Sequence, residues 1–139
     1  MIAFATQAVR DRPGPHFDQV ASALSLRERG LFGVVQVCAD WGGVADVARE
    51  LLEELDAVHA ERLGLEKCFT RANLRYQAHL ASYPMDWGGG ASLIAATVNA
   101  TGRAMVAHVG EMAAFRVHDD GVERVAIPHL PKVVFRSLG

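Results

Sequence analysis

The chain has 139 residues, a formal net charge of −2 and 50% hydrophobic residues. This length and composition are typical of one packed domain, so we expect a single domain spanning residues 1–139. Acidic and basic residues are mixed along the chain, which argues against nucleic-acid binding through a basic stripe. No segment approaches the ~20 apolar residues of a transmembrane helix, and the start lacks a signal-peptide pattern, so the expected location is the cytoplasm.

The N-terminal third predicts strands. Residues 2–8 and 17–26 have strand-like composition, and the breaker cluster at 12–15 (Arg-Pro-Gly-Pro) separates them. Residues 31–38 form a nearly continuous apolar run rich in valine, which is typical of a strand covered on both faces.

Two helices follow. From Val44 to Leu63, apolar residues recur at three- and four-residue spacing, with charged residues between them. Gly64 stands where a left-handed cap would end this helix. A second helix is expected from about Leu65 to Ala81, with Phe69, Ala72, Tyr76 and Leu80 on one stripe.

The pattern then changes back to strands, expected at 92–99, 103–109, 113–118 and 122–127. The glycine run at 88–90 reads as a flexible turn, and the Asp-Asp-Gly at 119–121 as a hairpin turn. Strands, two consecutive helices and an antiparallel meander predict an α+β domain with helices packed against a sheet. The two cysteines, Cys38 and Cys68, have no metal or redox spacing and are expected to be reduced.

Several phrases, in this order, resemble the type 2C (PPM) family of metal-dependent serine/threonine phosphatases. The strand ending in Val37-Cys38-Ala39-Asp40-Trp41-Gly42-Gly43 is similar to that family's V-A-D-G-M-G-G. The other phrases are Arg12 with His16-Phe17-Asp18 (R-x-x-N-E-D), Gly90-Ala91-Ser92-Leu93 (G-T-T-L), Ala107-His108-Val109-Gly110-Glu111 (A-N-V-G-D), Ile127-Pro128-His129 (T-x-D-H) and Phe135-Arg136-Ser137-Leu138-Gly139 (T-R-A-L-G).

The resemblance implies a shortened αββα sandwich and, in active members, hydrolysis of phosphoserine and phosphothreonine. Two Mn²⁺ or Mg²⁺ ions would activate a water, and an arginine would hold the phosphate through paired hydrogen bonds. Mapped onto this chain, Asp18 matches a metal-binding aspartate and Arg12 is the candidate for phosphate binding. Glu111 stands where the family has an aspartate, and Asp40 is the remaining candidate metal ligand and catalytic residue.

The position of the family's central bridging aspartate is Ala39 here, and a methyl group cannot bind a metal. Asp40 could replace it only if the strand end shifted by one residue; a role near the N-terminus of the following helix is the alternative. We therefore expect a binding or regulatory pseudophosphatase. An active Mn²⁺- or Mg²⁺-dependent phosphatase and an unrelated α+β interaction module are the alternatives. The expected partner is a protein or phosphoprotein, and unpaired sheet edges favour a homodimer or a partner that completes the sheet.

Overall fold

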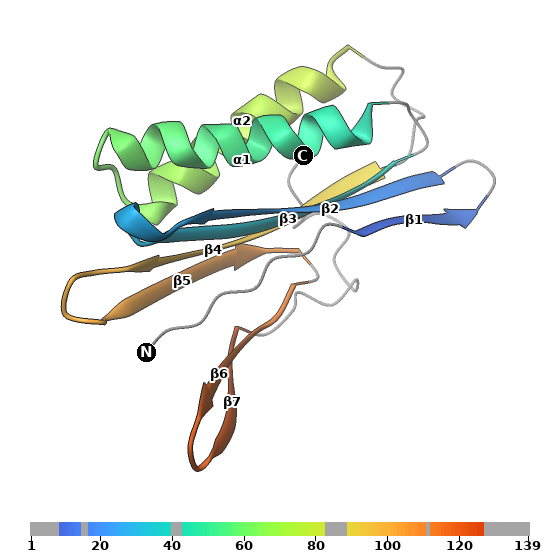
Figure 1. Ribbon diagram of the computed structural model, residues 1–139. Coiled ribbons are helices and arrows are strands. Elements are labelled where there is room, and N and C mark those ends of the chain that lie inside the picture. The colour runs from blue at the N-terminus through green and yellow to red at the C-terminus, as the bar shows by residue number, and fades with distance from the viewer. Residues whose placement is uncertain (1–8, 15–16, 40–42, 83–88, 111, 127–139) are drawn as a thin grey trace.

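The structure, a computed structural model, describes residues 9–14, 17–39, 43–82, 89–110 and 112–126. Along β1 and over much of β2 it describes the backbone alone. The elements in chain order are β1 Val9–Gly14, β2 Phe17–Leu26, the short 3₁₀ helix η1 Arg27–Arg29, β3 Leu31–Ala39, α1 Val44–Ala60, α2 Leu65–Leu80, β4 Gly89–Val98, β5 Ala104–Val109, β6 Ala114–His118 and β7 Gly121–Ala126 (Figure 1).

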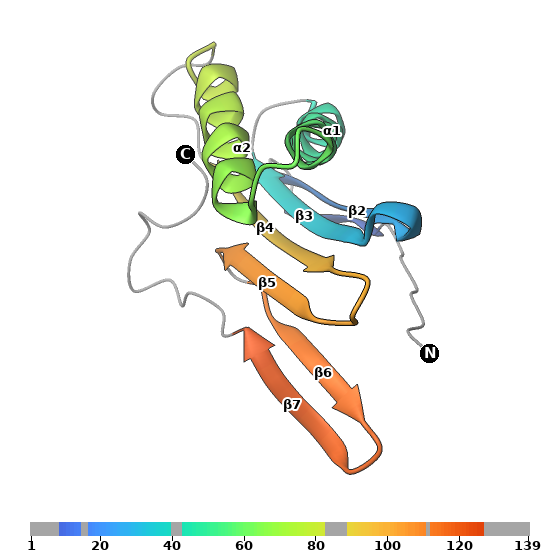
Figure 2. The same ribbon diagram turned by 90° about the vertical axis from the view of Figure 1, so that its left-hand side faces the viewer.

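Five strands form one antiparallel sheet in the order β1-β2-β3-β4-β5, and β6 pairs with β7 in a separate two-stranded sheet. Both helices lie on the same face of the larger sheet, while the β6–β7 hairpin extends away from it (Figures 1 and 2). The prediction of an α+β domain with two consecutive helices followed by a meander is confirmed. No helix in the described part of the chain is long and apolar enough to cross a membrane.

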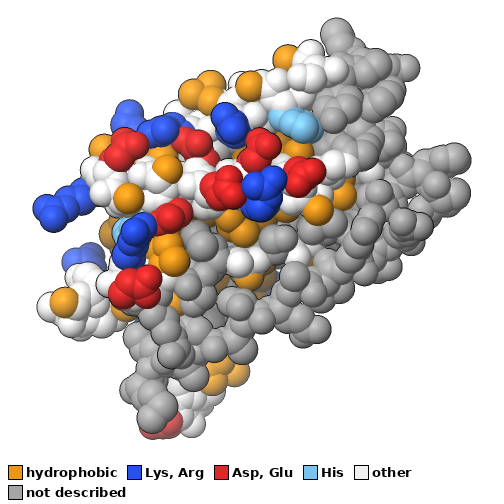
Figure 3. All heavy atoms as spheres, turned by 45° about the horizontal axis from the view of Figure 1, so that its top comes forward, with side chains coloured by type: hydrophobic (Ala, Val, Ile, Leu, Met, Phe, Trp, Pro, Cys, Tyr) orange, Lys and Arg blue, Asp and Glu red, His pale blue; other side chains and the backbone are white. Residues whose placement is uncertain are grey.

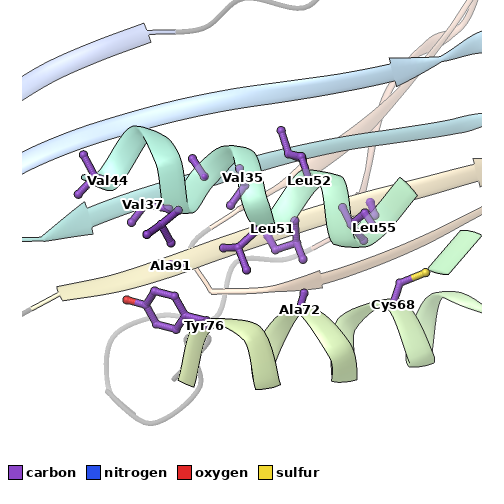
Figure 4. Packing of buried hydrophobic residues seen from close by; sticks show 14 of the residues in the cluster. Val35, Val37, Val44, Leu51, Leu52, Leu55, Cys68, Ala72, Tyr76 and Ala91 are labelled. Atoms are coloured by element: carbon purple, nitrogen blue, oxygen red, sulfur yellow. The ribbon is translucent and has the colours of Figure 1, made fainter. Parts of the chain in front are cut away.

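The core lies between the two helices and the sheet. Along β3, the buried residues Leu31, Val35, Val37 and Ala39 alternate with more exposed ones, so one face of the strand packs against the helices, whereas a strand covered on both faces was predicted. The cluster is completed by residues of α1, α2 and β4, among them Leu51, Leu55, Cys68, Ala72, Tyr76 and Ala91 (Figure 4). The apolar stripes of the two predicted helices are therefore what pack against the sheet.

The outer surface of the helices is charged. Arg71 bonds Glu54 of α1 at 2.7 Å and Glu61 at 3.2 Å, and Arg75 lies 3.4 Å from Glu50. Acidic and basic side chains are interspersed over both helices (Figure 3). Exposed ion pairs contribute little to stability, so these pairs define the solvated face of the helix pair and do not hold the fold together.

The end of α1 differs from the prediction. The helix stops at Ala60, and the residue in the left-handed conformation is Arg62, with φ 59°, whereas Gly64 has an extended conformation and precedes α2. The amide of Leu63 donates to the Val58 carbonyl, and that of Arg62 to the His59 carbonyl. This is the hydrogen-bond pattern of a Schellman cap, which requires the left-handed residue two positions after the last helical one.

The breaker cluster and the glycine run are both partly in strands. Arg12, Pro13 and Gly14 belong to β1. Proline is tolerated there because β1 is an edge strand with irregular pairing. Gly89 and Gly90 belong to β4, where they pair with the end of β3. The strand expected at 2–8 lies outside the described residues.

Candidate functional site

Two of the predicted site residues, Arg12 and Asp18, lie on neighbouring strands at one end of the five-stranded sheet. Asp18 of β2 lies directly opposite Ala39 of β3, and Ala39 in turn lies opposite Gly89 of β4. On the other side of β2, the pairing is regular up to Asp11 with Gln19 and resumes at Gly14 with Phe17. Two residues of β1, Arg12 and Pro13, therefore stand opposite Asp18 alone.

This two-against-one arrangement is a β-bulge, which bends an edge strand and redirects the residues within it. The bulge places Arg12, Asp18 and position 39 in one transverse row of the sheet, although 27 positions separate the first from the last in sequence. The sequence-based grouping of Arg12 with Asp18 around the end of the valine-rich strand therefore corresponds to neighbouring backbone positions. Asp40 and Glu111, the other two candidate ligands, lie outside the described residues.

Ala39 is fully buried. It belongs to the core cluster with Val35 and Val37, on the face of β3 that the helices cover. A carboxylate at this position would have to be desolvated, and metal coordination is one of the few interactions that compensate for that cost. The protein has a methyl group here instead, so the position contributes packing and no ligand atom.

The end of β5 is fixed by a close contact with β4. Val109, the last residue of β5, pairs with Leu93, and Gly110 follows with φ 85°. A Cβ atom on Gly110 would lie 2.2 Å from Ser92 Oγ, so no larger residue fits. Gly110, the glycine of the Val-Gly-Glu phrase, is thus required by packing as well as by its backbone angle.

The described residues do not fit a two-metal centre. They include no group of three or more His, Cys, Asp or Glu residues close enough to hold a metal ion. Of the positions that the resemblance assigns to metal binding, Asp18 is the one carboxylate residue within the described chain, and its strand neighbour Ala39 offers no oxygen. Hard divalent cations bind through several oxygen ligands, and the described part of this row has one candidate carboxylate, Asp18.

The tetrapeptide Asp-Trp-Gly-Gly occurs twice, at 40–43 and at 86–89. The first copy directly follows Ala39, and the second ends at Gly89, the strand partner of Ala39. Both copies are therefore joined to the same end of the sheet as Asp18. The repeat is visible in the sequence, but the pairing of β3 with β4 is what brings its two copies to the same end of the sheet.

Two cysteines and a tyrosine have raised pKa values: Cys38 is half-buried, and Cys68 and Tyr76 are buried in the core. Burial raises the pKa of the Cys38 and Cys68 thiols, and burial together with the nearby Cys38 raises the pKa of Tyr76 to about 12. All three therefore keep their protons at neutral pH, which makes them poor nucleophiles or bases. Both cysteines are free, as expected. The Tyr76 hydroxyl is buried with no hydrogen-bond partner among the described residues.

No protein-family model matches the chain, and no curated protein matches it. Among solved structures, the chain is similar to the PPM Ser-Thr phosphatase MsPP from Mycobacterium smegmatis in complex with cacodylate, with a TM-score of 0.69 and 20% sequence identity. The match covers 96% of this chain and 66% of that one. At this identity the similarity defines the fold: the chain folds like a PPM serine/threonine phosphatase, and it spans about two thirds of the length of that relative.

Proposed function

We propose that this chain is a pseudophosphatase, a phosphatase-like domain that works by binding rather than by two-metal hydrolysis. The observation that carries the proposal is the buried Ala39 opposite Asp18. Two-metal hydrolysis needs ions held close together by shared carboxylates. A domain that keeps the fold but has a methyl group at the shared position retains its surfaces for recognition and loses the centre for chemistry.

Calorimetric titration with Mn²⁺ and a phosphate-release assay on a phosphothreonine peptide test this proposal. We expect no stoichiometric Mn²⁺ binding and no release above the protein-free rate, in the wild type and in Asp18→Ala alike. Mn²⁺-dependent release that Asp18→Ala abolishes would instead establish an active Mn²⁺- or Mg²⁺-dependent serine/threonine phosphatase. Asp18, Asp40 and Glu111 would then be its metal ligands and Arg12 its phosphate-binding residue.

The β6–β7 hairpin offers a surface for binding another protein. Phe115 pairs with Arg124 and Val117 with Val122, so these four side chains share one face. Phe115 is 52% exposed, Val117 76% and Val122 66%. An exposed row of large apolar side chains on a protruding hairpin is typical of a contact surface, since a two-stranded hairpin is marginally stable alone.

The charges on the hairpin fit a second copy of this chain as the occupant. Arg124 lies over the Phe115 ring, 5.3 Å from its centre, and Arg116 pairs with Glu123 at 2.6 Å on the opposite face. The apolar face thus carries one cation, which is stacked on an aromatic ring, and two copies related by a two-fold axis could cover each other's valines. We therefore propose a homodimer through this face.

Size-exclusion chromatography with light scattering tests the dimer. The wild type should have twice the monomer mass, and Val117→Glu should reduce it to the monomer mass. Leu74→Glu is the matched control, because Leu74 is an equally prominent apolar residue, 58% exposed, on α2. A wild type that stays monomeric at high concentration would rule out self-association and leave a different protein as the occupant.

A further inference from the structure

A second candidate binding region lies at the opposite end of the sheet from Asp18, where three chain segments meet. β3 begins there at Leu31, eight residues before Ala39, a separation of roughly 27 Å along an extended strand. The segments are η1, the last turn of α1 and the turn between β4 and β5 (Figure 1). The amide of Val98 donates to the Gly30 carbonyl at 2.7 Å, and His59 Nε2 donates to the Arg29 carbonyl at 3.1 Å.

This junction is tightly built. A Cβ atom on Gly30 would lie 2.0 Å from the carbonyl oxygen of Val98, so β4 approaches the backbone closely here. In the β4–β5 turn, Asn99 Oδ1 accepts hydrogen bonds from the Thr101 amide at 3.1 Å, the Thr101 hydroxyl at 2.7 Å and the Arg103 amide at 2.9 Å. The turn that carries Arg103 is therefore held in one conformation.

A pocket of about 460 Å³ opens at this junction. Its lining combines two arginines and a histidine with neutral hydrogen-bonding side chains and apolar residues, and it includes Arg29, His59, Arg103, Thr97, Asn99 and Met105. Thr97 pairs with Met105 and with the buried Leu31. Thr97 and Met105 therefore lie on the helix-covered side of the sheet. Because these residues come from three separate segments, no local sequence motif marks the pocket.

Positive charge exceeds negative charge in the lining of the pocket. Arg29 bonds Asp56 of α1 at 2.5 Å through one of its terminal nitrogens, and no carboxylate of the described residues pairs with the other edge of its guanidinium group. Arg103 makes no ion pair with the described residues. Asn99 uses its oxygen within the turn, so its amide nitrogen remains as a donor, and Thr97 adds a hydroxyl.

We propose that this pocket binds a phosphoryl group, with Arg103 and the outer edge of Arg29 as its principal contacts. A dianionic phosphoryl group has three or more acceptor oxygens, and its charge lets it bind Arg29 while Arg29 also pairs with Asp56. A single carboxylate has fewer oxygens and less charge. The neutral donors Asn99 and Thr97 suit the remaining oxygens. The site is independent of the row at Asp18, so it stands whether or not the domain hydrolyses phosphate esters.

An NMR titration of the full chain with inorganic phosphate at low ionic strength tests the site. Saturable shifts are expected for the amides of Thr101 and Arg103, and Arg103→Gln should weaken the affinity about tenfold, the loss of one charge-assisted hydrogen bond. Arg75→Gln is the matched control, since Arg75 is an exposed arginine on α2 that pairs with Glu50. It should leave the affinity unchanged.

Three results would overturn the proposal. They are shifts that do not saturate, an equal loss of affinity in Arg103→Gln and Arg75→Gln, and shifts centred on Ala39 and Gly89 instead of the β4–β5 turn. The same titration with O-phosphoserine separates two sources of the group. If the pocket reads the phosphoryl group alone, phosphoserine and inorganic phosphate should bind within about threefold of each other. Thr97→Val, which keeps the shape of the side chain, should weaken both ligands by a smaller factor than Arg103→Gln.

Discussion

Asp18 and Ala39 lie directly opposite each other in the β2–β3 ladder, and Ala39 is fully buried against the helices. Introducing a carboxylate at position 39 would therefore bury a charge beside a second acidic residue. We expect Ala39→Asp to lower the free energy of unfolding by about 3 kcal/mol, measured by urea denaturation, and to create no phosphatase activity.

Ala95→Asp is the matched control for this substitution. Ala95 is also buried on the helix-covered face, but it pairs with Gly33 and Ala107 rather than with an acidic residue. Mn²⁺ should restore the stability of neither variant. A selective rise in the melting temperature of Ala39→Asp with Mn²⁺ would show that the remaining ligands of a metal site are present after all.

Gly110 is constrained both by its backbone angle and by Ser92. Gly110→Ala places a Cβ 2.2 Å from Ser92 Oγ at φ 85°, so we expect a loss of about 3 kcal/mol in the free energy of unfolding. Gly102→Ala isolates the effect of the angle, because Gly102 has φ 80° and open space around it. It should cost only about 1 kcal/mol. Equal losses in the two variants would argue against the close contact with β4.

Arg62 occupies the left-handed position of the α1 cap. Replacing it with glycine removes the steric cost of a Cβ at positive φ, so Arg62→Gly should raise the free energy of unfolding by about 0.5–1 kcal/mol. Arg62→Ala keeps the Cβ and removes the guanidinium group, and it should leave stability nearly unchanged. If Arg62→Ala stabilised the protein as much as glycine does, the effect would come from charge and not from backbone strain.

The Tyr76 hydroxyl is buried without a partner among the described residues, and the side chain is only 1% exposed. A buried polar group without a hydrogen bond reduces stability. Tyr76→Phe should therefore raise the free energy of unfolding by about 1 kcal/mol, measured by urea denaturation at pH 7. A loss of stability on this substitution would mean that the hydroxyl has a hydrogen-bond partner in the folded protein.

The raised pKa of Tyr76 predicts that the folded protein loses stability at alkaline pH. This pKa is raised from 10.0 to about 12 in the folded protein, so the folded state binds more protons than the unfolded state between these values, and stability falls as the pH rises. The loss should reach about 2 kcal/mol by pH 12. The raised thiol pKa values of Cys38 and Cys68 act in the same direction. In Tyr76→Phe, the slope of stability against pH above 10 should be smaller; an unchanged slope would assign the effect to other groups.

Local sequence patterns predict most of the elements and their order, although β1 and η1 were not expected at their observed positions. Apolar spacing predicts α1 and α2, the valine run predicts β3, and the phrase order indicates the phosphatase-like fold that the structural similarity bears out. These features are local or follow from burial patterns, so a single chain segment contains the necessary information. The resemblance to the phosphatase family also assigns Ala39 to the position of a metal ligand.

Which distant residues become neighbours depends on how the strands and helices pack. The β1 bulge that sets Arg12 opposite Asp18, the contact of Gly110 with Ser92, and the convergence of Arg29, His59 and Arg103 all depend on strand register and on where α1 ends. The left-handed cap at Arg62, expected at Gly64, was decided in the same way. The physical reason is that register and helix ends are chosen by burial of the whole core, which outweighs the local preference of any one residue.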